Sequence, residues 1–516
     1  MKKHLLGAAL IAAAVMASCT KEPAAGTAAD GAKAYLSVEI NLPDAARTKG
    51  QDIPGTNPGT AAEQTVNSVY VVGLNGDAVK GVYSLSTAEQ GTVGVGGTAA
   101  VAGDPFLVSP DIDRIFVVIN PSEASLASIK SASSYHALNS AITELVARSM
   151  ADGFMMTSAG TVAGDKGLVE VEPKVAASQS ATDIEAAKTA ARASATSVSV
   201  NRIMAKVQLA SNESMTVEHG ASARVEGWKL NTTNTRFYPY AELADYTLAG
   251  GTDPAPAQYR VDPNYSKLTM TIAADHSVSG EAATQFIWLD NKDNVASSSN
   301  PIVWNGLGES GVEYCHENTM ETAAQDYNNT TKMIIKASYA PDGVALGTSW
   351  FRVRGIVMTF DQMKADYASH TEGSDVRKGY EAFAQAMGAN SFDVLTLAIC
   401  EAVENGGYKA ACASTYTVEY FQKGVCYYDV NIKHDSRQEE FGLARWGVVR
   451  NNWYTLSVNS ISKPGKPYIP DPTDPDITDP ENPDPTDPTP DDEHSAYIAV
   501  SVNINPWTTW TQSVDL

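Results

Sequence analysis

The chain has 516 residues and a formal net charge of −23, with 43% hydrophobic and 19% charged residues. A chain of this length and apolar content can bury a sizeable core and is expected to form two or three domains. Five cysteines exclude a small disulfide scaffold. The excess of 60 acidic over 37 basic residues argues against nonspecific binding to nucleic acid, because the overall field repels phosphate.

The N-terminal residues are predicted to form a lipoprotein signal peptide. Two lysines precede an apolar run from Leu5 to Ala17, which is shorter than the roughly 20 residues that span a bilayer as a helix. The run ends at Met16-Ala17-Ser18-Cys19, which is similar to a bacterial lipobox. We therefore expect residues 1–18 to be removed and Cys19 to carry acyl chains such as palmitate. An ordinary signal peptide with an incidental cysteine is the alternative.

The segment that follows, residues 19–47, combines a predicted strand with a predicted protease site. Residues 34–42 alternate in the period of a strand with one buried face. The inward set is Leu36, Val38, Ile40 and Leu42. Arg47 then follows small residues and precedes a stretch rich in Pro and Gly, the kind of exposed segment that proteases cut. Cleavage between Arg47 and Thr48 would release the lipid and the strand together, although the neighbouring Lys49 leaves the bond open.

The body of the chain is predicted to be mainly β. Short β-rich runs separated by turn residues indicate antiparallel sheets packed as sandwiches. The runs are Val69–Leu74, Ile115–Ile119, Val198–Leu209, Lys332–Ser338, Trp350–Phe360, Tyr416–Tyr420, Val425–Ile432 and Tyr454–Ile461. Helical spacing predicts two inserted helices, over His136–Ser149 and Asp361–Met387. A boundary is expected near Asn212, which divides the body into residues 48–212 and 213–463.

The C-terminal residues are predicted to be a strand on a tether. Residues 464–494 carry ten prolines and ten acidic residues, so they are expected to stay extended and to hold the strand away from its own body. Residues 495–516 are too few for a domain, yet they begin with a strand-like alternation. The apolar set is Ile498, Val500, Val502, Ile504 and Trp507. A single strand cannot bury such a face alone, so it must dock into a sheet.

The two terminal strands share one pattern. Residues 34–42 align with residues 496–504 without a gap, and four of the nine positions are identical. Two strands of matching alternation and volume could occupy the same groove in turn, although a chance match is the alternative. Release of the first strand would leave a groove for the second strand of another molecule. Such a contact is head-to-tail and open, so it predicts a filament. The direction of the incoming strand stays open.

No catalytic or metal-binding motif is found. The chain lacks His-Glu-x-x-His and Gly-x-Ser-x-Gly, and the glycine-rich residues 91–97 lack the Lys-Ser/Thr of a phosphate loop. No enzyme, cofactor or metal site is therefore predicted. Four cysteines remain after Cys19 and allow between zero and two disulfides, with buried thiols or one bridge favoured. They are Cys315, Cys400, Cys412 and Cys426.

The order of these segments resembles the fimbrillins of type V pili. Three stretches of the body support the resemblance, namely Tyr314–Thr319, Cys426–Ile432 and Gly447–Tyr454. The ending, with Asn505-Pro506-Trp507 and a terminal Val-Asp-Leu, is similar to that of the major (stalk) subunit of short (minor, Mfa-type) fimbriae. The resemblance implies two tandem transthyretin-like antiparallel β-sandwich domains with a few inserted helices and an extended C-terminal donor strand.

The same resemblance implies a function at the cell surface. The protein would cross the periplasm to the outer membrane as a lipoprotein, be cut after an arginine, polymerise into a fimbrium (pilus) by donor-strand exchange and support cell adhesion. The implied partners are other copies of the chain, anchor and accessory fimbrial subunits, an arginine-specific protease, and host or bacterial adhesion ligands. The alternatives are an accessory or tip fimbrillin, or a non-polymerising surface lipoprotein that binds glycan through Trp228, Phe237, Tyr238 and Tyr240.

Overall fold

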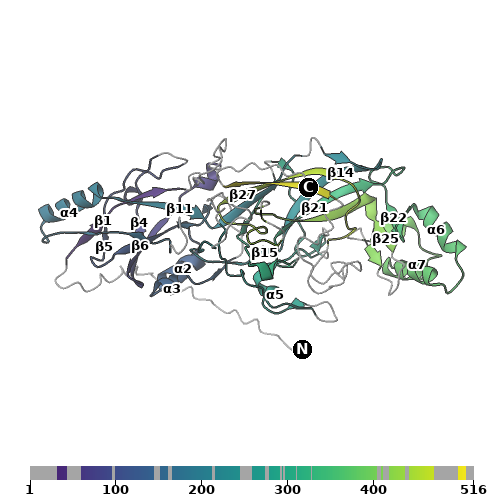
Figure 1. The fold of residues 1–516 in the computed structure, drawn as a ribbon, viewed down its shortest axis with the longest axis horizontal. Helices are drawn as coiled ribbons and strands as arrows, with labels where there is room; N and C mark the ends of the chain where they lie inside the picture. The colour runs from purple at the N-terminus through teal and green to yellow at the C-terminus, as the bar shows by residue number, and fades with distance from the viewer. Residues whose placement is uncertain are drawn as a thin grey trace, which may run out of the picture.

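The computed structural model describes most of the chain between residues 32 and 506. The described ranges are 32–42, 60–95, 99–144, 152–160, 166–211, 215–244, 259–272, 278–290, 293–294, 297–308, 311–326, 328–403, 408–410, 418–435, 438, 441–469 and 498–506. The described residues form an elongated molecule (Figure 1), with α4 (Ala181–Ala193) at one end of the long axis and α6 (Phe360–Ser369) at the other. The prediction of a mainly β protein with a few helices is confirmed.

The N-terminal body consists of two sheets. The larger sheet has the strand order β2-β11-β8-β6-β3-β4 with β9 beside β6, and the smaller has the order β10-β1-β5. The strands are β1 (Ala34–Leu36), β2 (Val38–Asn41), β3 (Val69–Asn75), β4 (Ala78–Leu85), β5 (Phe106–Val108), β6 (Arg114–Ile119), β8 (Met156–Ser158), β9 (Val169–Glu170), β10 (Lys174–Val175) and β11 (Thr196–Arg202). Apolar side chains of both sheets pack together in one core, so the two sheets form a sandwich.

Strand β6 explains why this body needs helices. Its run Ile115–Ile119 is buried on both faces. Ile115 and Val117 face the core between the sheets, whereas Phe116 and Val118 face a second cluster. The short helices α2 (Glu123–Ser131) and α3 (Tyr135–Leu138) contribute to that second cluster. A strand with apolar residues at every position therefore requires a cover on each side of its sheet.

One continuous segment joins the two bodies. Strand β11 belongs to the N-terminal sheet, and β12 (Met204–Leu209) belongs to a sheet of the C-terminal body. The change from one to the other falls at Ile203, upstream of the position 212 expected from the sequence. Because one residue separates the two strands, the backbone couples the bodies directly.

The C-terminal body also has two facing sheets. One has the order β13-β27-β12-β20, and β28 also pairs with β27. The other has the order β14-β21-β26. The strands are β13 (Thr216–Val217), β14 (Ser222–Asn231), β20 (Val312–His316), β21 (Lys332–Ala340), β26 (Val425–Asn431), β27 (Asn452–Ile461) and β28 (Ile498–Pro506). Their inward side chains form the largest core cluster of the described residues, which includes Trp228 and Tyr454.

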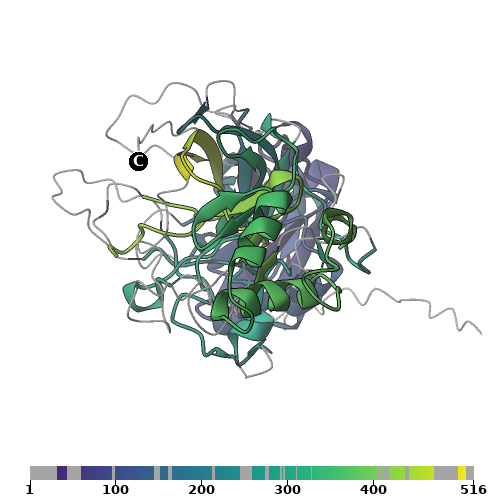
Figure 2. The same cartoon turned by 90° about the vertical axis from the view of Figure 1, so that its right-hand side faces the viewer.

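A separate unit of helices and strands lies at the end remote from α4 (Figures 1 and 2). Its sheet has the order β23-β22-β25-β24, with β22 (Trp350–Val353), β23 (Ile356–Met358), β24 (Tyr408–Ala410) and β25 (Val418–Phe421). Helices α6, α7 (Asp375–Ala386) and α8 (Leu397–Ala402) pack on it around a core of their own. The predicted helix Asp361–Met387 is thus two helices, because Gly373 adopts a φ of +76° and Ser374 caps a new helix.

The predicted helix His136–Ser149 is wrong for residues 139–144, and residues 145–149 lie outside the described residues. Helix α3 ends at Leu138, and Ile142 pairs instead with Phe237 in a short antiparallel ladder. Asn139 accepts a hydrogen bond from the Tyr240 backbone N–H, which fixes the end of the helix. Leu138 and Ile142 of the helical pattern therefore belong to a helix end and a strand, and both are buried in one cluster.

The sequence predicts purely antiparallel sheets, but the structure also contains parallel ladders. Strand β2 runs parallel to β11, and both β12 and β13 run parallel to β27. The remaining ladders among the described strands are antiparallel. Parallel pairing carries no turn signal in the sequence, since the paired strands are connected by long intervening chain.

The remaining elements are short. They are α1 (Thr87–Gln90), α5 (Ala282–Gln285), the 3₁₀ turns η1 (Ala62–Gln64), η5 (Thr322–Ala324) and η6 (Gln422–Gly424), and the strand pairs β7 (Ile142–Thr143) with β16 (Arg236–Phe237), β15 (Thr233–Asn234) with β19 (Phe286–Ile287), and β17 (Thr271–Ile272) with β18 (Val278–Ser279). Within the described ranges, no helix has the length and apolar character needed to cross a membrane.

Candidate functional site: the two terminal strands and the interbody junction

The leading strand passes through both sheets of the N-terminal body. Strand β1 lies between β5 and β10 and is antiparallel to both, and β2 lies at the edge of the larger sheet, parallel to β11. Leu36, Val38, Ile40 and Leu42 are each at most 3% exposed and belong to the core between the sheets. The predicted inward face of this strand is thus the buried face in the structure.

Backbone and side-chain hydrogen bonds hold the leading strand on both of its edges. Beyond the β11 ladder, the Leu42 N–H donates to the Gly94 carbonyl and the Gly94 N–H donates to the Ile40 carbonyl, each at 2.9 Å. The buried Ser37 hydroxyl donates to the Gly103 carbonyl at 2.7 Å. Removal of β1 and β2 would therefore leave a long apolar slot with unpaired backbone groups along both sides.

The C-terminal strand lies on its own molecule. Strand β28 pairs antiparallel with β27 along its whole length, from Ile461 opposite Ile498 to Asn452 opposite Pro506. Ile498 and Val500 are buried in the core of the C-terminal body. The expectation that the acidic tether keeps this strand off its own body is therefore wrong, because β27 offers a free edge with an alternating buried face.

The beginning of the predicted tether is also packed. Lys466 and Tyr427 exchange two backbone hydrogen bonds of 2.8 Å, and Ile469 is buried against Ile334 and Tyr427. Residues 464–469 thus belong to the C-terminal body, although their proline content predicted an extended segment. Cys19, Arg47, Thr48, most of the tether and Trp507 lie outside the described residues, as do the side chains of Val502 and Ile504.

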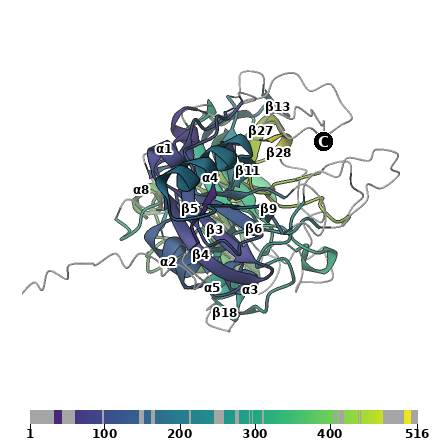
Figure 3. The ribbon, with the colours of Figure 1, turned by 90° about the vertical axis from the view of Figure 1, so that its left-hand side faces the viewer.

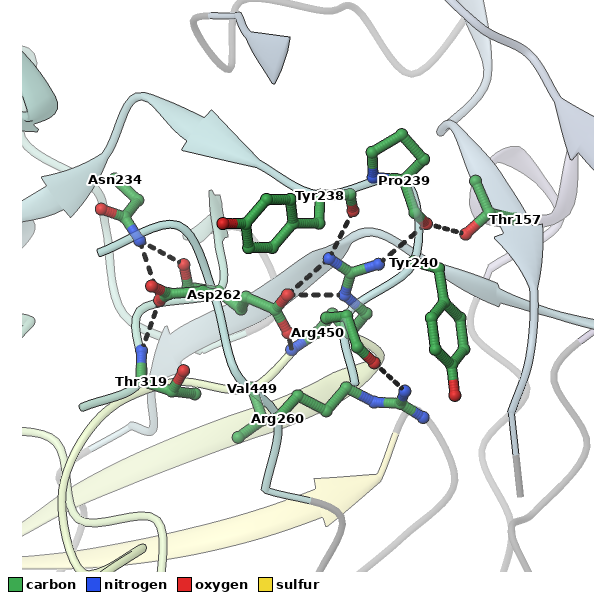
Figure 4. A network of polar contacts seen from close by, with 12 residues as sticks. Thr157, Asn234, Tyr238, Pro239, Tyr240, Arg260, Asp262, Thr319, Val449 and Arg450 are labelled. Atoms are coloured by element: carbon green, nitrogen blue, oxygen red, sulfur yellow. Dashed lines mark hydrogen bonds and ion pairs between the residues drawn. The ribbon is translucent and has the colours of Figure 1, made fainter. Parts of the chain in front are cut away.

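Two of the sequence stretches that carried the resemblance meet in a buried ion pair (Figure 4). The Arg450 guanidinium contacts the Glu317 carboxylate through Nε, at 2.8 Å, and through Nη2. It also donates to the carbonyls of Tyr238 at 2.8 Å and Pro239 at 3.2 Å. Both charged side chains are at most 3% exposed. The pair ties the residues just before β27 and just after β20 to the loop around Pro239, whose carbonyl also accepts a hydrogen bond from Thr157 of the N-terminal body.

Burial shifts the pKa of two neighbours of this pair. Burial and the charge of Glu317 raise the pKa of Asp262 to about 8. Asp262 accepts hydrogen bonds from Asn234 Nδ2 and the Thr319 backbone N–H. Burial lowers the pKa of His316 to about 4, and its Nε2 lies 2.8 Å from the Glu144 carbonyl oxygen. Asp262 and His316 are both enclosed by protein, so their role is to stabilise the fold.

A second buried ion pair joins the two bodies. Glu63 of η1 lies 2.7 Å from Lys206 of β12, with 1% and 4% of their side chains exposed. Burial alone would raise the pKa of Glu63, but hydrogen bonds from Lys206 and the Tyr314 hydroxyl lower it below its usual range. This pair could not be predicted from the sequence, because Glu63 and Lys206 are far apart in the chain. It fixes the first described residues after the predicted cleavage site to the junction.

The structure offers no support for the chemical alternatives. Cys315, Cys400 and Cys426 are buried free thiols, and Cys412 lies outside the described residues. Among the residues the structure describes, no cluster of His, Cys, Asp and Glu could hold a metal ion. Trp228, Phe237 and Tyr240 are at most 2% exposed, so these rings are core residues and form no sugar-binding face.

Comparison with known proteins identifies the C-terminal region. Residues 419–513 match the family model described as the C-terminal region of fimbrillin, the major fimbrial subunit protein type IV. No curated protein sequence matches the chain. The matched residues include β25, β26, β27 and β28, so they cover both the docked C-terminal strand and Arg450 of the buried ion pair.

Several crystal structures are similar to the chain at low identity. A candidate cell adhesion protein of Parabacteroides distasonis is 15% identical, with a TM-score of 0.41 over 93% of this chain and 99% of that one. A fimbrilin of Porphyromonas gingivalis is 13% identical, with a TM-score of 0.38 over 93% and 98% of the two chains. The tip fimbrial protein Mfa3 of P. gingivalis is 11% identical, with a TM-score of 0.32 over 93% and 100%.

The family model that matches the C-terminal region describes a structural fimbrial subunit, which agrees with the prediction that the chain is not an enzyme. The chain is a mainly β protein whose C-terminal region is similar to that of the fimbrillins, the subunits of cell-surface fimbriae.

Proposed function

We propose that the chain is a structural subunit of a type V fimbria, that it is the stalk subunit, and that it polymerises by exchange of terminal strands. The observation that carries this proposal is the leading strand, which fills a slot in the N-terminal body and has a near copy at the other end of the chain. Ala34 and Val38 are buried, and both are identical in the copy. Asn41 donates to Ser197 Oγ at 2.9 Å, and the copy keeps this asparagine as Asn503.

The energy of filling the slot is favourable in sign and size. Burial of four apolar side chains, at roughly 1.5 to 3 kcal/mol each, stabilises a strand in the slot by about 6 to 12 kcal/mol. The copy replaces Leu36, Ile40 and Leu42 by Ile498, Val502 and Ile504, which preserves most of that burial. Ordering of the tether opposes binding, but the ladder hydrogen bonds add about 1 kcal/mol each.

The docked position of β28 adds one step to this scheme. The same inward residues Ile498 and Val500 pack into the C-terminal body of their own molecule, so the strand must leave β27 before it enters a neighbour. The 28 residues between Ile469 and Ile498 supply the reach, on the order of 80 Å in an extended conformation. An uncut molecule has its slot filled by β1 and β2 and its C-terminal strand on β27, so it stays monomeric.

Under this proposal the chain matures by lipidation and then by cleavage. Cys19 carries the lipid during export to the outer membrane, and an arginine-specific protease cuts after Arg47 to free the slot. The two tandem sandwiches, which meet at Ile203, are of the transthyretin type. The mature fimbrium contacts anchor and accessory subunits and, through them or directly, adhesion ligands.

Cleavage-dependent assembly tests the proposal. Purified chain treated with an arginine-specific protease should begin at Thr48 and form fibres in electron microscopy, whereas Arg47→Ala should stay monomeric. Arg47 lies between β2 and the next described residue, Thr60, outside the strands that fill the slot, so this variant should fold normally. Fibres from the Arg47→Ala variant, or a surface protein that still begins at Cys19, would contradict the proposal and favour the non-polymerising lipoprotein. Fibres capped by this chain alone would favour a tip subunit.

A further inference from the structure

The leading strand has one large side chain on its outer face. Ala34 and Leu36 point into the core between the sheets, whereas Tyr35, between them, belongs to a separate cluster. Tyr35 is 7% exposed although it faces away from that core. Its cover is α4, which lies at the end of the molecule (Figures 1 and 3).

Helix α4 presents a small-residue surface to this ring. Its fully buried residues are Ala187 and Ala191, four positions apart, and Ile184 and Ala176 complete the cluster around Tyr35. The Lys188 ammonium lies 5.5 Å from the centroid of the Tyr35 ring, within the range of a cation–π contact. Arg192 of the same helix forms an exposed ion pair with Asp104, at 2.7 Å, so α4 is held by the apolar cluster around Tyr35 together with this surface contact.

The C-terminal copy keeps this tyrosine although the strand pattern does not require it. An outer position of a strand tolerates most residues, and the neighbouring outer positions do differ, with Glu39 replaced by Ser501. Ser37, which donates to the Gly103 carbonyl, is replaced by Ala499, so the copy forgoes that hydrogen bond. Tyr35, in contrast, is matched by Tyr497.

We propose that α4 and Ala176 form a tyrosine-binding surface that takes Tyr497 of a second copy and thereby fixes the register and direction of the incoming strand. This inference rests on the strand exchange proposed above and deepens it. A strand that runs in the direction of β1 and β2 places Tyr497 under α4. A strand that runs in the opposite direction, with the same residues inward, places Asn505 there, which cannot fill the space of a ring or engage Lys188.

A peptide-binding experiment tests the side chain. Chain cut after Arg47 and freed of its leading segment is titrated with a fluorescent peptide of residues 495–507, at concentrations too low for polymerisation. Replacement Tyr497→Ala should weaken binding about 10- to 100-fold, and Tyr497→Phe by less than about 3-fold, because the ring makes the contact. Ser501→Ala is the matched control at an outer position and should bind as the unchanged peptide does.

The outcomes separate the two proposals. If the unchanged peptide does not bind, strand exchange itself is overturned. If it binds and Tyr497→Ala binds equally well, strand exchange stands and the tyrosine-binding surface is overturned. Direction is tested with a photoreactive phenylalanine analogue at position 497 or 505 of the peptide. Cross-links from position 497 to residues 181–193 support the inference, and cross-links to these residues from position 505 instead contradict it.

Discussion

The buried pair of Arg450 and Glu317 predicts a large and specific loss of stability when one partner is removed. Glu317→Gln keeps the shape of the side chain but leaves the Arg450 charge with only the neutral carbonyls of Tyr238 and Pro239. An unpaired charge at this burial, 3% exposed for Arg450, costs about 3 to 5 kcal/mol. The matched control is Lys378→Met, whose ion pair with Asp375 is 67% and 63% exposed and contributes less than about 1 kcal/mol.

Urea unfolding measures this difference. Tryptophan fluorescence follows the C-terminal body, because Trp228 and Trp446 are both buried there. We expect Glu317→Gln to lower the free energy of unfolding by about 3 to 5 kcal/mol at an unchanged urea dependence, and the double variant Glu317→Leu/Arg450→Met to recover part of the loss. A difference below about 1 kcal/mol between Glu317→Gln and Lys378→Met would refute the reasoning.

Three further changes have defined outcomes. Burial lowers the pKa of His316 from its usual 6.5 to about 4, so the stability that the neutral imidazole supports is lost as the pH falls from about 6.5 to 4. His316→Gln should therefore remove about 3 kcal/mol of the pH dependence of the unfolding free energy across that window. Gly447→Ala should destabilise more than Gly343→Ala, because both have positive φ but only at Gly447 would a Cβ lie 2.3 Å from a backbone oxygen; equal melting temperatures would contradict this. Burial raises the pKa of Cys400 and Cys426 to about 12, so neither thiol should react with iodoacetamide at neutral pH until urea unfolds the chain, as mass spectrometry would show.

Local patterns were enough to predict several of the longer strands, although β4, β14 and β20 were missed. The runs at Val69–Leu74, Ile115–Ile119 and Tyr454–Ile461 all lie within strands of the structure. These runs are β-branched and are buried on one or both faces, so their composition is set by the sheet itself. The same holds for the leading strand, whose inward residues were identified from alternation alone.

Long-range pairing could not be predicted in this way. Glu63 and Lys206, or Glu317 and Arg450, are separated by more than a hundred residues, and no local pattern marks a charge that will be buried. The pairing of β28 with β27 of its own chain was missed for a related reason. The alternation of residues 498–504 indicates that a face must be covered, but it does not say whether β27 or the slot of another molecule covers it.

Helix α4 was missed because its sequence, rich in alanine, lacks an apolar stripe. Only Ala187 and Ala191 are buried within it, and small residues give a weak periodic signal. Its partner Tyr35 is identical to Tyr497 in the alignment of the two terminal strands. A tyrosine shared at an outward-facing position was the available clue that another element covers it.

The partner of Asn503 in the assembled state tests strand exchange most directly. In the monomer Asn503 lies opposite Thr455 of β27, whereas Asn41, its counterpart in the leading strand, contacts Ser197. Chains carrying Asn503→Cys are mixed with chains carrying Ser197→Cys or Thr455→Cys, cut after Arg47 and oxidised. Strand exchange predicts a disulfide-linked dimer of the Asn503→Cys and Ser197→Cys chains, which is absent when Arg47→Ala is present. Fibres in which Asn503→Cys is linked to Thr455→Cys, with no link to Ser197→Cys, would contradict the account.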